Sequence, residues 1–194
     1  MATLPSDLQQ ILDEIDQSDR AADSLVAGLT DEQLHWQPEN GRAWSIAQCL
    51  EHLATMNVVY GGAVRMGIDS ARASGSTRRD AGKLGFFGAR WVRAMEPPVR
   101  QRMRSPGSTR PSSGLPREEV LRRYHAAHVM VREMVRDAAT IDVNRATFRN
   151  PFIRLIRVRV VTGLHVIPAH DRRHLWQAEQ VRKRPDFPGA ARPH

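Results

Sequence analysis

The stretch GLHVIPAHDRRHLWQAEQV, residues 163–181, decides how this chain is expected to fold and where its site lies. It places His170 and His174 four residues apart, which on a helix puts both imidazoles on one face, about 5 to 6 Å apart at Cβ. A buried imidazole loses its hydrogen bonds to water and therefore needs a partner. The spacing alone fits either one shared metal ion or two hydrogen-bonded core histidines. On a helical wheel the pair falls in the inward stripe with Val160, Ile167, Ala178 and Val181.

The length and cysteine content indicate one domain. A chain of 194 residues buries enough surface to fold without covalent staples, and its one cysteine, Cys49, excludes an internal disulfide. The chain does not open with a basic segment followed by an apolar run, and nowhere do eighteen apolar residues run together. We therefore expect a cytoplasmic protein without a membrane partner.

The net charge is +8 and the isoelectric point is near 11.0, which raises the possibility of binding to nucleic acid. Only Lys83 and Lys183 are lysines among the 29 basic residues, and the arginines are spread from Arg20 to Arg192. A spread of this kind favours a solvated basic surface over a nucleic-acid site. A basic nucleic-acid-binding module stays the less favoured alternative.

Four amphipathic segments predict long helices at about 5–27, 45–66, 117–138 and 154–183. Capping boxes are expected at Ser6 with Gln9 and at Ser45 with Gln48. Together with the absence of strand-like alternation, these segments predict an all-α fold, a four-helix bundle. We expect one domain over residues 1–184 and a C-terminal tail of loop or disorder over residues 185–194.

Residues 67–116 interrupt the helical pattern between the second and third long helices. Loops rich in Gly, Ser, Pro and Arg flank the segment KLGFFGARWVRAMEPP, in which Leu84, Phe87, Trp91 and Met95 fit one face of a short helix. An insertion of this length is either functional, such as a lid over residues 70–115, or a solvated excursion.

Three further histidines lie on the second and third predicted helices. His52 falls roughly 120° from the centre of its helix's inner stripe, so spacing places it on the flank, where it faces a pocket between helices or solvent. His125 and His128 are spaced i, i+3, but their Ala and Met neighbours indicate ordinary packing or edge positions. The inner stripe of the second helix is Ile46, Leu50, Leu53, Ala54 and Asn57.

Two motifs, WSIAQCLEHL at 44–53 and AHDRRHLWQAEQV at 169–181, on helices in matching order, make the chain resemble the DinB-like family of metal-dependent enzymes. The resemblance implies a DinB-like four-helix bundle in which His52 joins His170 and His174 around one divalent ion. Three neutral imidazoles leave one position open, as in catalytic zinc sites. Nitrogen ligands suit zinc, nickel, iron or copper about equally well by softness, so the ligands do not identify the metal. We expect zinc or nickel before iron.

The wider superfamily implies a thiol-dependent S-transferase that uses a low-molecular-weight thiol and a small-molecule substrate. A hydrolase, with water in place of the thiol, and a non-catalytic metal-binding bundle are the alternatives, and a homodimer is left open. Arginines between Arg78 and Arg110 are candidates for holding the thiol's carboxylates. Gln48 and Gln177, about one turn from the expected ligands, are candidates for orienting them. No residue is assigned as a catalytic base.

Overall fold

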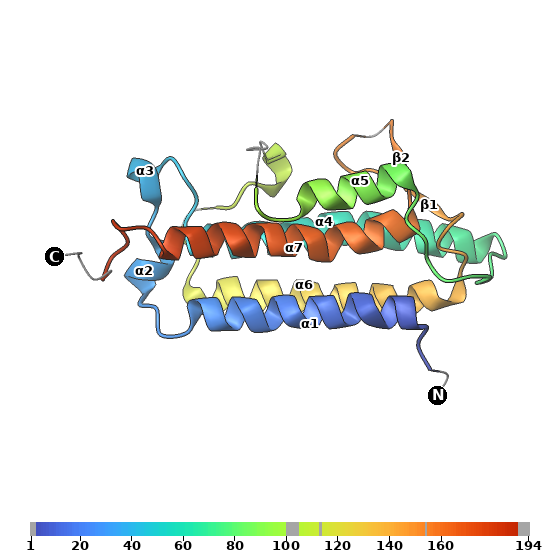
Figure 1. Ribbon diagram of the computed structural model, residues 1–194, viewed down its shortest axis with the longest axis horizontal. Coiled ribbons are helices and arrows are strands. Elements are labelled where there is room, and N and C mark those ends of the chain that lie inside the picture. Colours follow the sequence, from blue (N-terminus) through green and yellow to red (C-terminus); the bar gives the residue numbers. More distant parts are fainter. Residues whose placement is uncertain (1–2, 100–104, 113, 154, 190–194) are drawn as a thin grey trace.

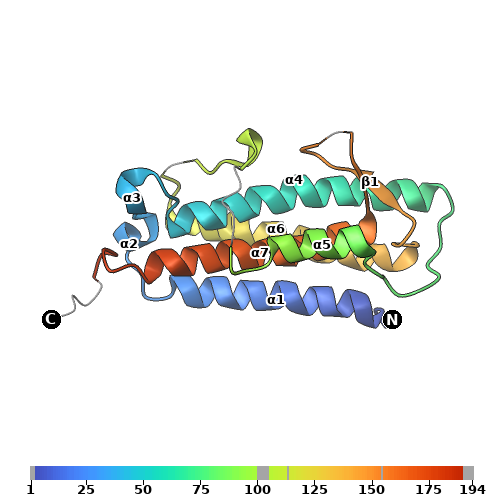
Figure 2. The same ribbon diagram turned by 45° about the horizontal axis from the view of Figure 1, so that its top comes forward.

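The structure is a computed structural model that describes residues 3–99, 105–112, 114–153 and 155–189. Its long helices form an all-α four-helix bundle (Figure 1), which confirms the predicted fold class. The first and second helices each pack against both the third and the fourth, so that they occupy opposite corners of the bundle (Figure 2). The four helices are α1 (Ser6–Val26), α4 (Ile46–Ala73), α6 (Arg117–Asp137) and α7 (Val160–Arg182).

Shorter elements fill the connections. An extra helix, α5, lies along α7, and a two-stranded hairpin packs against α4 (Figures 1 and 2). These two additions therefore cover parts of α7 and α4. The shorter elements are α2 (Asp31–His35), α3 (Pro38–Gly41), α5 (Phe86–Met95), the 3-10 helices η1 (Gly107–Thr109) and η2 (Ala138–Thr140), and the strands β1 (Thr147–Arg149) and β2 (Arg157–Arg159).

Local sequence signals set the helix starts in two different ways. Ser45 caps α4 as predicted, since its hydroxyl accepts from the Gln48 N–H at 3.1 Å and the Gln48 side chain accepts from the Ser45 N–H at 3.0 Å. The capping box predicted at Ser6 does not form. Pro5 is the residue that precedes α1, so Ser6 already lies inside the helix and Gln9 bonds to Asp13 instead.

The hairpin corrects the prediction of a helix that begins at residue 154. β1 and β2 pair antiparallel with Phe148 opposite Val158, and α7 begins only at Val160. In each strand one inward residue stands between partly or fully exposed neighbours. Alternation over three residues is too short to distinguish from one turn of an amphipathic helix, so the sequence pattern merged β2 with α7.

The predicted apolar face of α5 is also wrong in part. Met95 is buried and Trp91 packs against the core, but Phe87 is 82% exposed. Gly88 explains the rotation of the helix, because a Cβ at this position would lie 2.6 Å from Oγ1 of Thr162 on α7. The contact face is therefore built around a residue without a side chain, which a search for large apolar residues overlooks.

The C-terminal segment is partly packed on the domain. Phe187 is buried, and its ring meets that of Trp36 edge to face with centroids 5.6 Å apart. The predicted tail of loop or disorder is thus held as far as Pro188, whose carbonyl accepts from the Gln33 side chain at 2.9 Å, and residues 190–194 lie outside the described part of the chain.

The core encloses the protein's single thiol. Cys49 on α4 is fully buried, and this burial raises the pKa of the thiol to about 12.

Within the described residues, none of the helices combines the length and the apolar character that crossing a membrane requires.

Candidate metal centre

Three imidazoles meet between α4 and α7. His52 comes from α4, whereas His170 and His174 come from consecutive turns of α7, two and six residues after Pro168. One nitrogen from each ring lies within 4.8 Å of the other two. The ring centroids are 5.3 Å apart for His52 and His170 and 4.5 Å apart for each of the other two pairs. This is the only such group of His, Cys, Asp and Glu ligands among the described residues.

The site is almost closed to solvent. His52 is 2% exposed, His174 is 8% exposed and His170 is half-buried. The indole of Trp44 covers one side, with its ring 4.9 Å from that of His52 and 5.7 Å from that of His174. His52 is buried although it lies off the inner stripe, because α4 is covered by α6 and α7 and also by the hairpin and η1.

A backbone carbonyl fixes the orientation of His52. Its Nδ1–H donates to the carbonyl oxygen of Thr109 in η1 at 2.7 Å, with the hydroxyl of Ser105 3.3 Å from the same nitrogen. A neutral imidazole carries one N–H and one lone pair, so this bond leaves the lone pair on Nε2. A hydrogen bond on the far nitrogen is the usual way in which proteins orient a metal-binding histidine.

Burial keeps all three rings neutral. It lowers the pKa of His52, although the bond to Thr109 opposes the shift, and it lowers the pKa of His170 to about 3, assisted by charge on His52. Burial also lowers the pKa of His174, to which charge on the other two rings and on Arg173 adds, whereas the Gln177 side chain raises it. Neutral imidazole is the form that ligates metals.

The residues present fit a metal ion. Nδ1 of His174 is buried and has no hydrogen-bond partner. An unpaired buried polar atom costs about 1 to 3 kcal/mol, and a metal–nitrogen bond in this cluster would remove such a cost. Neutral nitrogen donors suit zinc, nickel, iron or copper better than calcium or magnesium, which prefer oxygen.

In a comparison with protein-family models, the chain matches the DinB superfamily over residues 14–178. The chain belongs to the DinB superfamily. All three histidines lie inside the matched region, as do the four long helices except for the first residues of α1 and the last of α7. Neither the curated proteins nor the solved structures contain a match.

The other sequence candidates of this DinB superfamily member occupy different surroundings. Gln177 lies beside His174 closely enough to affect its pKa. The amide of Gln48 serves the start of α4, because its oxygen accepts from the Ser45 N–H and from Gln37 at 2.7 Å. Arg78 pairs with Asp7 at 2.6 Å, and arginines 100, 102 and 104 lie outside the described residues.

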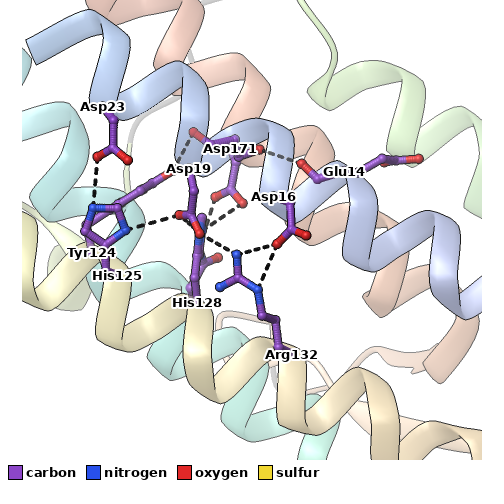
Figure 3. Close-up of polar contacts among 11 residues, drawn as sticks. Glu14, Asp16, Asp19, Asp23, Tyr124, His125, His128, Arg132 and Asp171 are labelled. Atoms are coloured by element: carbon purple, nitrogen blue, oxygen red, sulfur yellow. Dashed lines mark hydrogen bonds and ion pairs between the residues drawn. The ribbon is translucent and has the colours of Figure 1, made fainter. Parts of the chain in front are cut away.

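A second polar cluster, which the sequence prediction missed, runs from the bundle interior to the α1–α6 surface (Figure 3). Asp171 and His128 are both fully buried and lie 3.2 Å apart, from Oδ2 to Nε2. The other oxygen of Asp171 accepts from Asn57 at 3.0 Å, and Nδ1 of His128 donates to Asp19 at 2.6 Å. Arg132 also bonds to Asp19 and so completes the outer end of the cluster.

The histidine of this cluster is charged near neutral pH. Burial alone would lower the pKa of His128, but the charge of Asp171 and the hydrogen bonds that His128 donates to Asp171 and Asp19 outweigh it and raise the pKa to about 9. One feature of the sequence indicated this polar cluster: Asn57 lies in the inner stripe of α4, and a buried amide requires a polar partner. The i, i+3 pair on α6 gave no hint, because its acidic partners come from α1 and α7.

Proposed function

We propose that this DinB superfamily member is a metal-dependent enzyme in which His52, His170 and His174 bind one divalent transition-metal ion, with zinc or nickel favoured over iron. The observation that carries the proposal is the convergence of one ring nitrogen from each of three neutral imidazoles on α4 and α7, at a place where Nδ1 of His174 is buried and has no hydrogen-bond partner. A structural role alone would not require three imidazoles, and catalytic rather than structural zinc sites are the ones that use three protein ligands.

The chain's own residues prepare the site for a nucleophile. When bound, the ion would supply Lewis acidity, which lowers the pKa of a water or thiol that joins it. Trp44 excludes bulk water from one side, and Thr109 holds the ring of His52 in one orientation. The guanidinium of Arg173 is buried near the triad and donates to the carbonyl of Ala94 at 3.2 Å, so its positive charge favours an anionic nucleophile there.

Two reaction classes follow from this chemistry. In thiol-dependent S-transfer, a low-molecular-weight thiol attacks an electrophilic small molecule; in hydrolysis, water takes its place. The only thiol of the chain is buried and has a raised pKa, so a thiol nucleophile has to come from solution. We favour S-transfer and keep hydrolysis as the second candidate.

The first experiment measures metal content. Protein purified without a histidine tag should contain about one transition-metal ion per chain, and His174→Ala should lose most of it, because two remaining ligands bind far more weakly. His125→Ala is the matched control, since this histidine is partly exposed on α6 and faces Asp19 and Asp23 instead. Equal metal content in all three proteins would refute the proposed ligand set.

The second experiment measures turnover of electrophilic substrates with and without added thiols. Turnover that requires the thiol supports S-transfer, and turnover without it assigns hydrolysis. A metal-loaded protein that turns over neither type of substrate would be a non-catalytic metal-binding bundle. DNA affinity titrated against salt tests the basic-module alternative, because phosphate contacts produce a steep salt dependence.

A further inference from the structure

Residues 105–112, here named the strap, pass over α4 beside the triad and include η1, which contacts α4. Two consecutive residues of α4 hold this segment. His52 bonds to the carbonyl of Thr109, and Glu51 bonds to Ser112, three residues further along the strap. A ligand of the proposed metal and its sequence neighbour therefore share one loop.

The Glu51 anchor is strong. One carboxylate oxygen accepts from the Ser112 backbone N–H at 2.8 Å and from the Ser112 hydroxyl at 2.5 Å. The Glu51 side chain is 7% exposed, so solvent screens these bonds little. Hydrogen bonds to an ionised acceptor are roughly twice as strong as those between neutral groups.

One anchor of the strap lies in an internally bonded turn, and the other, Ser112, follows it by three residues. Thr109 is fully buried, and its backbone N–H and hydroxyl donate to the carbonyl of Pro106 at 3.0 and 3.1 Å. The hydroxyl of Ser105 lies 3.1 Å from that of Thr109. Only Arg110 and Pro111 separate the two anchors, so losing the bonds at Ser112 should loosen the position of the Thr109 carbonyl.

We propose that Glu51 is a positioning residue that acts on His52 through the strap. A docked strap presents the Thr109 carbonyl, which accepts only, so His52 must carry its proton on Nδ1 and offer its lone pair from Nε2. This inference rests on the proposed metal site for its functional meaning. A metal ligated through Nε2 favours the same tautomer, so docking of the strap and binding of the metal strengthen each other reciprocally.

The test compares Glu51→Ala with Glu51→Gln, which retains an oxygen acceptor for Ser112. Glu133→Ala is the matched control, because Glu133 is exposed on α6. In metal-free protein, ring ¹⁵N NMR should show His52 protonated on Nδ1, and hydrogen exchange should show a protected Ser112 amide. Glu51→Ala should lose both signatures, and the glutamine and control variants should retain them.

The second readout is metal affinity, measured by competition of Zn²⁺ with a chromophoric chelator. Glu51→Ala should weaken binding about tenfold, at the lower end of the range for residues that orient ligands. An unchanged tautomer and unchanged amide protection in Glu51→Ala would overturn the inference, and so would unchanged Zn²⁺ affinity after both had been lost. Should wild-type protein bind no metal while Glu51→Ala still loses both NMR and exchange signatures, the proposed function would fail and the positioning role would stand.

Discussion

Replacing His128 by leucine would isolate the energetic role of the buried polar cluster. Leucine occupies a similar volume, so the change removes the imidazolium without opening a large cavity. It leaves the carboxylate of Asp171 fully buried, with Asn57 as its remaining hydrogen-bond donor. We expect a large loss of stability because an ionised carboxylate would then lack its charged partner.

Two estimates of the loss agree. The pKa of His128 rises from 6.5 to about 9 on folding, and at 1.36 kcal/mol per pKa unit this corresponds to about 3 kcal/mol at pH values below the unfolded pKa. Breaking a buried ion pair by removing one partner costs about 3 to 5 kcal/mol. His128→Leu should therefore lower the free energy of unfolding by about 3 kcal/mol.

Guanidinium chloride unfolding at pH 6, followed by circular dichroism, measures this loss. The double variant with Asp171→Asn is the control for charge, since asparagine keeps the oxygen that accepts from Asn57 but removes the stranded charge. It should recover at least half of the loss. A cost below about 1 kcal/mol for His128→Leu, or strictly additive single-variant effects, would refute the assignment of His128 and Asp171 as a coupled buried pair.

Two further changes probe the same core. The folded pKa of His128 lies above its unfolded value of 6.5, so its contribution to stability is complete below pH 6.5 and is lost as the pH rises through about 9. The unfolding free energy of the wild-type protein should therefore fall over this pH interval. A parallel fall in His128→Leu would show that the pH dependence does not come from His128. Gly163→Ala should destabilise by about 1 to 3 kcal/mol, because its Cβ would lie 2.7 Å from the ring of Phe148 and 2.8 Å from Val64. Gly62→Ala in α4 is the matched control, since nothing lies within 4 Å of its Cβ and the change should be neutral or stabilising; equal thermal midpoints for the two variants would contradict the close packing at Gly163.

Sequence periodicity predicted the existence of the long helices because their buried stripes repeat over five to eight turns, but the predicted end of the second helix at about residue 66 was wrong, since α4 continues to Ala73. The start of α4 was predictable from Ser45 and Gln48, whose side chains satisfy the first backbone groups of the helix. The start of α7 was not, because β2 contributes a single buried residue, Val158, to the core. The missing information there is the pairing with β1, a contact between segments that no local pattern records.

The site likewise contains residues that local sequence predicts and residues that it does not. The spacing of His170 and His174 follows from helix geometry, so their shared face was predictable from local sequence. The inclusion of His52 came from the family motif, since its position on the wheel indicated a flank. The contacts of Asp171 with His128 and Asn57 depend on how three helices assemble, and a residue next to a ligand in sequence gives no sign of such distant partners.

The enclosure of Cys49 makes this thiol a built-in reporter of opening at the start of α4. An alkylating reagent reacts with the thiolate only, which burial suppresses in the native protein. The rate at which Cys49 is alkylated therefore reports transient exposure of this part of α4, which carries His52 three residues after Cys49. Because the chain has one cysteine, each molecule can be labelled at only one thiol. Electrophiles tried as substrates should for the same reason leave Cys49 of the folded protein unmodified, so an adduct on this thiol marks molecules that had opened.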